Sequence, residues 1–178
     1  MSDRVSRSAA ATAGVGKTAP STAARRRRRQ VRRGEPSLEL KRVFLVPRAR
    51  MYELFVDPVR LARWWGPRGF SVPSIDFAPR VGATYRIEMQ PPEGDAFDLT
   101  GRFRDVDAPS RLAFSFNWEP ADQDDLETLA ELSFRALGNS TEVVLTQGVF
   151  KTDERLALHR QGWTESFEKL GELVSQRR

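Results

Sequence analysis

Few residues in this chain of 178 could carry out chemistry, and the first to consider is its one histidine, His159. An imidazole changes charge near neutral pH, so it could act as a general acid or base if a partner lay within hydrogen-bond reach. The candidate partners are Asp98, Glu88, Glu131 and Tyr85, and spacing along the chain places none of them beside it. A lone histidine on an apolar helix face is more often a core residue, so the sequence predicts no catalytic residue.

Several other chemistries are excluded by composition. The chain has no cysteine, which excludes disulfides, thiolate metal sites and cysteine nucleophiles. A single histidine excludes a histidine-rich zinc site. No Ser/His/Asp order, glycine-rich phosphate loop or metal-spaced carboxylate cluster is visible, so we expect neither a cofactor nor a metal.

Aromatic side chains carry the stronger signal. Trp64 and Trp65 are adjacent and are followed by the break Gly66–Pro67. Because large aromatics are costly to expose, this pair should close a helix and direct its rings against a core or a cavity. A second aromatic row follows on one face of a single strand: Leu112, Phe114, Phe116 and Trp118. A neighbouring row contains Phe97, Leu99 and Phe103.

Two glycines leave the choice between core and cavity open. Gly101 interrupts the neighbouring row, where it either bends the strand or leaves space. Gly162 lies inside a predicted helix, where glycine costs about 1 kcal/mol relative to alanine. A close backbone approach or room for a ligand would explain it. For most of the aromatic residues a packed core is the simpler interpretation.

The elements that position these residues can be predicted from periodicity and turn residues. A strand over 38–46 precedes a helix over 48–56 and a short helix that starts at Asp57–Pro58 and ends at Gly66–Pro67. Six strands with turn signals between them follow: 72–77, 84–89, 97–106, 112–118, 127–137 and 141–147. The last element is an amphipathic helix over 153–175, with Leu156, His159, Trp163, Phe167, Leu170 and Val174 in one stripe. Glu165 and Lys169 should pair on its solvent-exposed face. This pattern predicts an α+β fold with an antiparallel sheet against one long helix.

Charge divides the chain into two parts. Residues 1–36 hold ten Lys and Arg against Asp3 and Glu35, whereas residues 37–178 hold 19 against 22 Asp and Glu, a net −3. The first part has no periodic apolar residues, so we predict a disordered tail at 1–36 and a folded domain at 37–178. Arg25–Arg33 is either a solvated extension, a weak contact for nucleic acid or another polyanion, or part of a targeting peptide. No apolar run approaches the length of a membrane span, and we expect a cytoplasmic protein.

Five segments in order carry a family resemblance: Arg63–Phe70, Gly82–Tyr85, Gly101–Phe103, Leu112–Trp118 and His159–Trp163. From Leu38 to about Val174, the chain resembles single-domain homologues of the activator of the 90-kDa heat-shock-protein ATPase. These belong to the SRPBCC superfamily, also called START-like. The resemblance implies a helix-grip fold, in which a curved antiparallel sheet wraps around the long C-terminal helix. It also implies a pocket between them, formed here by Trp64, Trp65, Phe70, Tyr85, Phe103, Phe116, Trp118, His159 and Trp163.

Three functions are compatible with this resemblance. We predict non-catalytic binding of a small hydrophobic or aromatic molecule in that pocket. Polyketide cyclase-like members of the superfamily use the same cavity for chemistry, which is the enzyme alternative. A co-chaperone that stimulates the heat-shock ATPase is the third alternative, with the chaperone as partner. Fold alone does not decide among them.

Overall fold

A computed structural model describes residues 35–176 of the chain, so all but the last two residues of the tail predicted at 1–36 lie outside this range. The described part is one α+β unit with a seven-stranded antiparallel sheet in the order β1-β7-β6-β5-β4-β3-β2. The strands are β1 (Ser37–Phe44), β2 (Ile75–Asp76), β3 (Thr84–Met89), β4 (Phe97–Asp107), β5 (Arg111–Glu119), β6 (Thr128–Leu137) and β7 (Ser140–Gly148). The helices are α1 (Arg48–Val56), α2 (Pro58–Leu61) and α3 (Asp153–Ser175).

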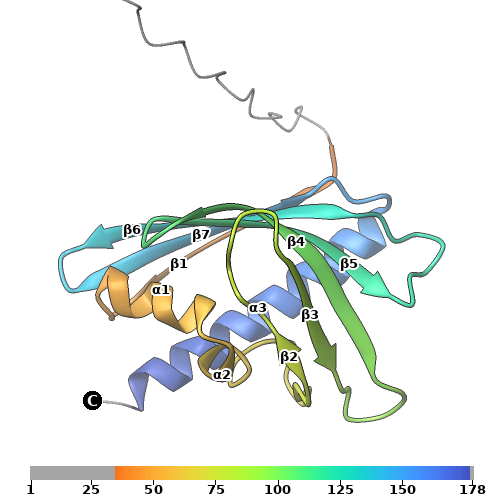
Figure 1. The fold of residues 1–178 in the computed structure, drawn as a ribbon, viewed down its shortest axis with the longest axis horizontal. Coiled ribbons are helices and arrows are strands. Elements are labelled where there is room, and N and C mark those ends of the chain that lie inside the picture. Colours follow the sequence, from red (N-terminus) through yellow and green to blue (C-terminus); the bar gives the residue numbers. More distant parts are fainter. Residues whose placement is uncertain (1–34, 177–178) are drawn as a thin grey trace, which may run out of the picture. The chain divides into compact units, whose positions relative to one another are not determined.

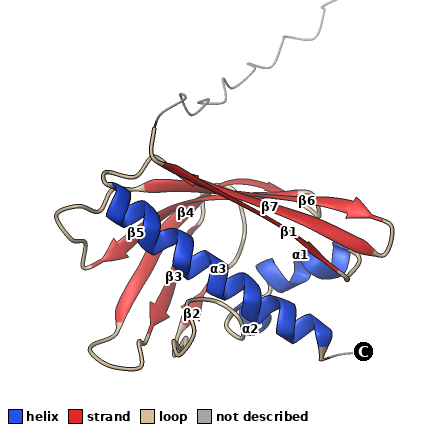
Figure 2. Cartoon of the chain, turned by 180° about the vertical axis from the view of Figure 1, so that it is seen from behind, coloured by secondary structure: helices blue, strands red, loops and turns tan. Residues whose placement is uncertain are grey.

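The sheet curves around α3, which crosses its concave face (Figure 1). Part of the curvature has a local cause, because the register between β4 and β5 shifts between Phe103 and Asp105. Such an irregularity bends the strand and increases its twist. Seen from behind, α1 and α2 lie beside one end of α3, on the same face of the sheet (Figure 2). The predicted helix-grip fold is therefore confirmed.

The helix boundaries follow from capping residues. Asp57 accepts a hydrogen bond from the Arg60 backbone N–H at 3.1 Å, and Pro58 occupies the first turn of α2. Thr152 accepts a hydrogen bond from the Arg155 backbone N–H at 3.2 Å and starts α3. Asp153 and Glu154 then place negative charge at its positive N-terminal end.

Three predicted boundaries are wrong. The short helix expected to end at Gly66–Pro67 ends at Leu61, and residues 62–64 are turns. The strand expected over 72–77 is only the two residues Ile75–Asp76, with an isolated bridge between Ser71 and Gln90. The first strand ends at Phe44 rather than at residue 46, and Leu45 is exposed. By contrast, the hairpin between β6 and β7 turns where predicted, with Gly138 at a φ of +62° that favours glycine.

The core lies between α3, α1 and the concave face of the sheet. Trp64 is completely buried, and its indole N–H donates to the Leu54 carbonyl at 2.9 Å. Its ring packs against Phe55 with centroids 4.6 Å apart. On α3 the buried residues are His159, Trp163, Ser166, Phe167, Leu170 and Leu173. The predicted stripe is thus largely confirmed, except that Leu173 rather than Val174 is buried at its C-terminal end.

Candidate ligand-binding cavity

A cavity of about 420 Å³ lies beside the N-terminal half of α3. Its walls come from α3, β3, β4, β5, the segment that follows α2 and the loop after β5. The lining residues are Trp65, Gly66, Pro67, Phe70, Met89, Phe97, Phe116, Trp118, Pro120, Asp122, Asp125, Arg155, Leu158, His159, Gly162, Trp163 and Ser166. The volume falls in the range of ligand pockets, which is about 300–1,000 Å³.

Six of the nine residues predicted for the pocket line this cavity: Trp65, Phe70, Phe116, Trp118, His159 and Trp163. The other three lie outside it. Trp64 is in the core beside Phe55, while Tyr85 and Phe103 belong to a ring cluster with Phe77. The side chains of these three residues are 0–3% exposed. They pack against other side chains and border no open space of this cavity.

Gly101 leaves no space, because the strand beside it fills the gap. A Cβ there would lie 1.9 Å from the Ser115 carbonyl oxygen and 2.7 Å from Tyr85 Cε1. The Tyr85 hydroxyl lies across the same position and donates to the Ser115 carbonyl at 2.7 Å. The glycine therefore allows a close backbone approach and does not mark a ligand site.

Gly162 is different, because it forms part of the cavity wall. A Cβ there would lie 3.7 Å from Pro67 Cγ, which is an ordinary van der Waals distance. Apart from its chain neighbours and the nearby backbone of α3, no other atom lies within 4 Å of it. The absence of a side chain at this turn of α3 leaves the volume in front of Trp65 and Phe116 open. Of the two glycines, only this one has the role of providing room.

His159 is held by the indole of Trp118, whose Nε1 donates to His159 Nε2 at 3.1 Å. The imidazole is buried between aromatic rings, with Phe150 and Phe116 centroids at 4.8 Å and 5.2 Å. Burial lowers the pKa of His159 from 6.5 to about 4, and the nearby charges of Asp125 and Arg155 act in opposite directions. The ring is therefore neutral at pH 7.

Three of the four residues considered as acid or base partners of His159 are engaged elsewhere. Asp98 pairs with Arg86, and Glu131 pairs with Arg111 at 2.5 Å. The Tyr85 hydroxyl is used by the Ser115 carbonyl, and burial raises the pKa of that hydroxyl well above its usual value. None of these contacts brings a proton donor or acceptor to His159.

The polar end of the cavity is formed by two aspartates and one arginine. Arg155 pairs with Asp122, and its Nε lies 3.4 Å from Asp125 Oδ1. The Asp122 backbone N–H donates to the Asp125 carboxylate at 2.8 Å. Lys151 ties the same loop from outside the lining, with its Nζ 3.0 Å from Asp124 Oδ1. The loop after β5 is thereby attached to the first turns of α3.

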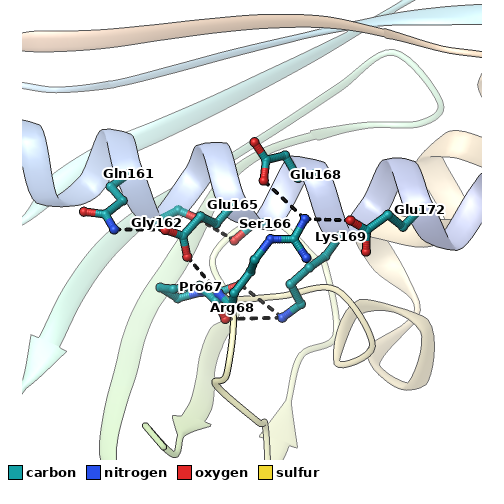
Figure 3. A network of polar contacts seen from close by, with 10 residues as sticks. Pro67, Arg68, Gln161, Gly162, Glu165, Ser166, Glu168, Lys169 and Glu172 are labelled. Atoms are coloured by element: carbon teal, nitrogen blue, oxygen red, sulfur yellow. Dashed lines mark hydrogen bonds and ion pairs between the residues drawn. The ribbon is translucent and has the colours of Figure 1, made fainter.

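The opposite rim is attached to α3 by Lys169 and Arg68 (Figure 3). The Lys169 ammonium donates to the carbonyls of Trp65 and Gly66, both at 3.1 Å. Glu165 accepts from the Arg68 backbone N–H at 2.8 Å, and the Arg68 guanidinium contacts Glu172 at 2.6 Å. The predicted pair of Glu165 and Lys169 on the exposed helix face is therefore wrong, because both side chains hold the rim loop instead.

Burial lowers the pKa of Lys169. Hydrogen bonds from Gln161 and Arg68 lower the pKa of Glu165. The lowered pKa of Glu165 keeps its carboxylate ionised at pH 7, as its contact with the Arg68 backbone N–H requires.

Trp163 faces the sheet as expected, and it makes a buried polar contact that the sequence did not suggest. Its indole N–H donates to Gln147 Oε1 at 2.7 Å, and the Gln147 amide donates to Thr128 Oγ1 at 2.7 Å. All three residues are buried. Because Trp163 is fixed from the sheet side, the part of its ring that borders the cavity has a defined position.

Sequence reasoning missed the polar end and most of the rim. Met89, Pro67, Asp122, Asp125, Arg155 and Ser166 line the cavity but belong to a strand end, loops and a helix flank. A signal was available for the loop, since Asp122, Asp124 and Asp125 are followed by Lys151 and Arg155 at the start of the last helix. Nothing in the spacing indicates that Arg155 turns toward the cavity.

Within residues 35–176, no group of three or more His, Asp or Glu side chains is arranged to hold a metal ion. None of the helices described there combines the length and apolar character that a membrane crossing requires.

The sequence profile of the family described as "Activator of Hsp90 ATPase homolog 1-like protein" (AHSA1) matches residues 45–175. The chain belongs to this family. A search of curated proteins finds no match for this chain. Among solved structures, an AHSA1 protein from Silicibacter pomeroyi is 26% identical with a TM-score of 0.71, covering 80% of this chain and 99% of its own.

Two further solved structures share the fold. A protein from Chromobacterium violaceum is 24% identical with a TM-score of 0.71, covering 78% of this chain and 96% of its own. A protein from Arthrobacter aurescens is 22% identical with a TM-score of 0.70, covering 80% of this chain and 87% of its own. At these identities the two likenesses show a shared fold.

Proposed function

We propose that this AHSA1-family domain binds a small apolar or aromatic molecule in the cavity and releases it unchanged. The observation that carries the proposal is the cavity itself, whose volume is about 420 Å³ and whose lining includes Trp65, Phe70, Phe97, Phe116, Trp118 and Trp163. Binding sites for small molecules are typically concave and mostly apolar, with a few polar groups that fix orientation. Here those groups are His159 and the cluster of Asp122, Asp125 and Arg155.

Preorganisation of the walls supports binding. Lys169 holds the loop at Trp65 and Gly66, and Arg155 holds the loop at Asp122 and Asp125. A cavity whose walls are fixed before the ligand arrives loses less conformational freedom on binding. If the same aromatic residues were packed together without a cavity, their positions would not depend on polar contacts at both rims.

The enzyme alternative, a polyketide cyclase-like reaction in this cavity, is tested by turnover. His159 is neutral, accepts a hydrogen bond from Trp118 and has no acid or base partner among Asp98, Glu131 and Tyr85. These observations support binding without turnover. Chemical conversion of a bound compound, lost in His159→Gln, would establish the enzyme instead.

The co-chaperone alternative rests on the family description, which refers to activation of a heat-shock ATPase. It predicts that the purified domain accelerates ATP hydrolysis by a 90-kDa heat-shock protein. A domain that accelerates the ATPase, carries no co-purified molecule and is not stabilised by apolar compounds would replace ligand binding by this function.

The direct test is native mass spectrometry of the full chain, which should reveal a co-purified small molecule. A matched pair of variants then locates it. Gly162→Leu should fill the cavity and abolish stabilisation by apolar compounds, whereas Gly162→Ala should retain it, since a Cβ there meets Pro67 at only 3.7 Å. At a ligand concentration of 100 times Kd, mass action stabilises the fold by about 2.7 kcal/mol. Equal stabilisation of both variants would place the ligand elsewhere.

The tail calls for a separate test, because Arg25–Arg33 lies outside the described residues. A weak contact with nucleic acid or another polyanion stays a prediction, as do the domain boundary at residue 37 and a cytoplasmic location. Removal of residues 1–34 should abolish any binding to DNA or RNA, and in the full chain added salt should weaken that binding strongly. Binding that survives the truncation would assign it to the domain.

A further inference from the structure

The hydrogen bond between Trp118 and His159 fixes which nitrogen of the imidazole carries the proton. An indole N–H can only donate, so His159 Nε2 must act as the acceptor in their 3.1 Å contact. In a neutral imidazole one nitrogen accepts and the other donates. The proton therefore sits on Nδ1.

His159 Nδ1 is a donor with open space beside it. It hydrogen-bonds to no residue within 35–176, and in that range the only closed-off side-chain N or O atom without a partner is the Tyr52 hydroxyl. Nδ1 is therefore not closed off from solvent-sized space, although the residue is only 8% exposed. The ring lines the cavity, so we assign the open space beside this N–H to the apolar volume of the cavity.

The charges around this donor are unfavourable for an anion. Asp122 and Asp125 outnumber Arg155, which they already engage. His159 adds no positive charge at pH 7, since burial holds its pKa at about 4. A carboxylate at this end would face a net negative wall, whereas an uncharged oxygen would not.

We propose that the ligand carries an uncharged oxygen acceptor, a carbonyl or hydroxyl, that accepts a hydrogen bond from His159 Nδ1–H while its apolar body occupies the aromatic part of the cavity. This inference rests on the proposed function and narrows it to a chemical class. Trp118 is then a positioning residue, because it fixes the tautomer that presents the donor.

Three probes of nearly equal shape test the proposal: 2-acetylnaphthalene, 2-isopropylnaphthalene and 2-naphthoate. Their binding to the full chain is followed by quenching of tryptophan emission. The informative quantity is the ratio of the affinities for the ketone and the hydrocarbon, because a purely structural effect changes both affinities together. His159→Gln, which can still meet Trp118 but has no donor in the position of Nδ1, should lower this ratio by about three- to tenfold. His159→Asn, whose amide nitrogen can take the position of Nδ1, should keep most of it.

The carboxylate probe tests the charge argument independently. 2-Naphthoate should bind at least about tenfold more weakly than the ketone, and Asp125→Asn should narrow that gap. The matched control is Asp124→Asn. Asp124 pairs with Lys151 and does not line the cavity, so this variant should leave the difference in affinity between ketone and carboxylate unchanged. If the His159 variants fail to fold, the comparison of Asp125→Asn with Asp124→Asn still tests whether the cavity prefers an uncharged ligand to an anion.

The outcomes separate the two proposals. Probes that bind with the same ketone-to-hydrocarbon ratio in wild type and His159→Gln, or a carboxylate that binds as well as the ketone, overturn this inference alone. If no probe binds and native mass spectrometry finds no small molecule, the proposed function fails and this inference fails with it.

Discussion

Two clusters of aromatic rings lie at different places on the same concave sheet face, and only one of them borders open space. In the filled cluster, Phe77 packs against Tyr85 and Phe103 with centroids 5.3 and 4.9 Å apart. In the cavity cluster, Trp118 packs against Phe97 and Phe116 at 5.2 and 5.0 Å. Ring spacing is therefore the same in both clusters and does not explain why one is closed.

The difference comes from what faces each cluster. Phe77 reaches over the filled cluster from the segment before β3, and Gly101 lets the Ser115 backbone approach. The cavity cluster faces Gly162 on α3 and the Gly66–Pro67 loop, which contribute little side-chain volume. A cavity in this fold thus arises where small residues face an aromatic row. The aromatic row alone does not indicate whether a cavity is present.

The largest expected effect is a difference between two phenylalanine truncations. Phe103→Ala, in the filled cluster, should lower the free energy of unfolding by about 3–5 kcal/mol, because it leaves a void among fixed rings. Phe97→Ala removes a half-buried ring that already borders the cavity, so it should cost less than about half of that. Urea denaturation measures both. Equal costs would mean that the two clusters are equally packed and would break the comparison.

Gly101→Ala should have the next largest effect on the free energy of unfolding. Its Cβ would lie 1.9 Å from the Ser115 carbonyl oxygen, so the backbone of β5 must move, at a cost near the upper end of overpacking, about 3 kcal/mol. The measurement is again the free energy of unfolding in urea. A cost below about 0.5 kcal/mol would show that the strands separate easily there and that the cluster is less closed than described.

The pH dependence of stability tests how dry the cavity wall is at His159. The pKa in the folded state, about 4, lies below the ordinary 6.5, so stability is present above pH 6.5 and is lost as the pH falls toward 4. Between pH 7 and pH 5 this amounts to about 2 kcal/mol.

His159→Gln should remove that dependence over the same range. The charged neighbours Asp125 and Arg155 stay in place in the variant, so its stability profile isolates the imidazole. Identical profiles for both proteins would mean that the ring is hydrated, and the cavity cluster would then differ from the filled cluster in water content as well as in volume.

The smallest effect has the opposite sign. Gly162→Ala should raise the free energy of unfolding by up to about 1 kcal/mol, because alanine favours the helix and its Cβ meets Pro67 at 3.7 Å without a clash. A shift in Tm measures it. Destabilisation would show that the wall of α3 is tighter than the cavity implies, and Gly162 would then resemble Gly101.

Much of the fold could be predicted because its signals are local. Asp57 and Thr152 cap their helices as the spacing indicates, and Gly138 turns the hairpin. The strand over 72–77 failed, because Val72 and Phe77 are core-facing residues of an extended loop whose pairing is limited to Ile75–Asp76. Alternating apolar residues look the same in a loop packed on a core as in a paired strand.

The site was harder to predict for a physical reason. Trp65 and Trp163 could be placed near a cavity from the family resemblance, but so could Trp64, Tyr85 and Phe103, which are closed off. Residue type and periodicity indicate that a ring faces the interior of the domain. Whether space remains in front of it depends on residues distant in sequence, such as Phe77 for one cluster and Gly162 for the other.

The sequence by itself determined the order of elements, the inward face of α3 and of the two aromatic strands, and the family, because these depend on periodicity, capping and motif order. Only the tertiary structure decided that Gly101 closes a gap, that Gly162 opens one, and that Arg155 turns to Asp122 and Asp125. It also decided that Trp118 donates to His159, across 41 positions of the chain. Each of these is a contact between distant segments, and its distance is set by how the sheet curves around the helix.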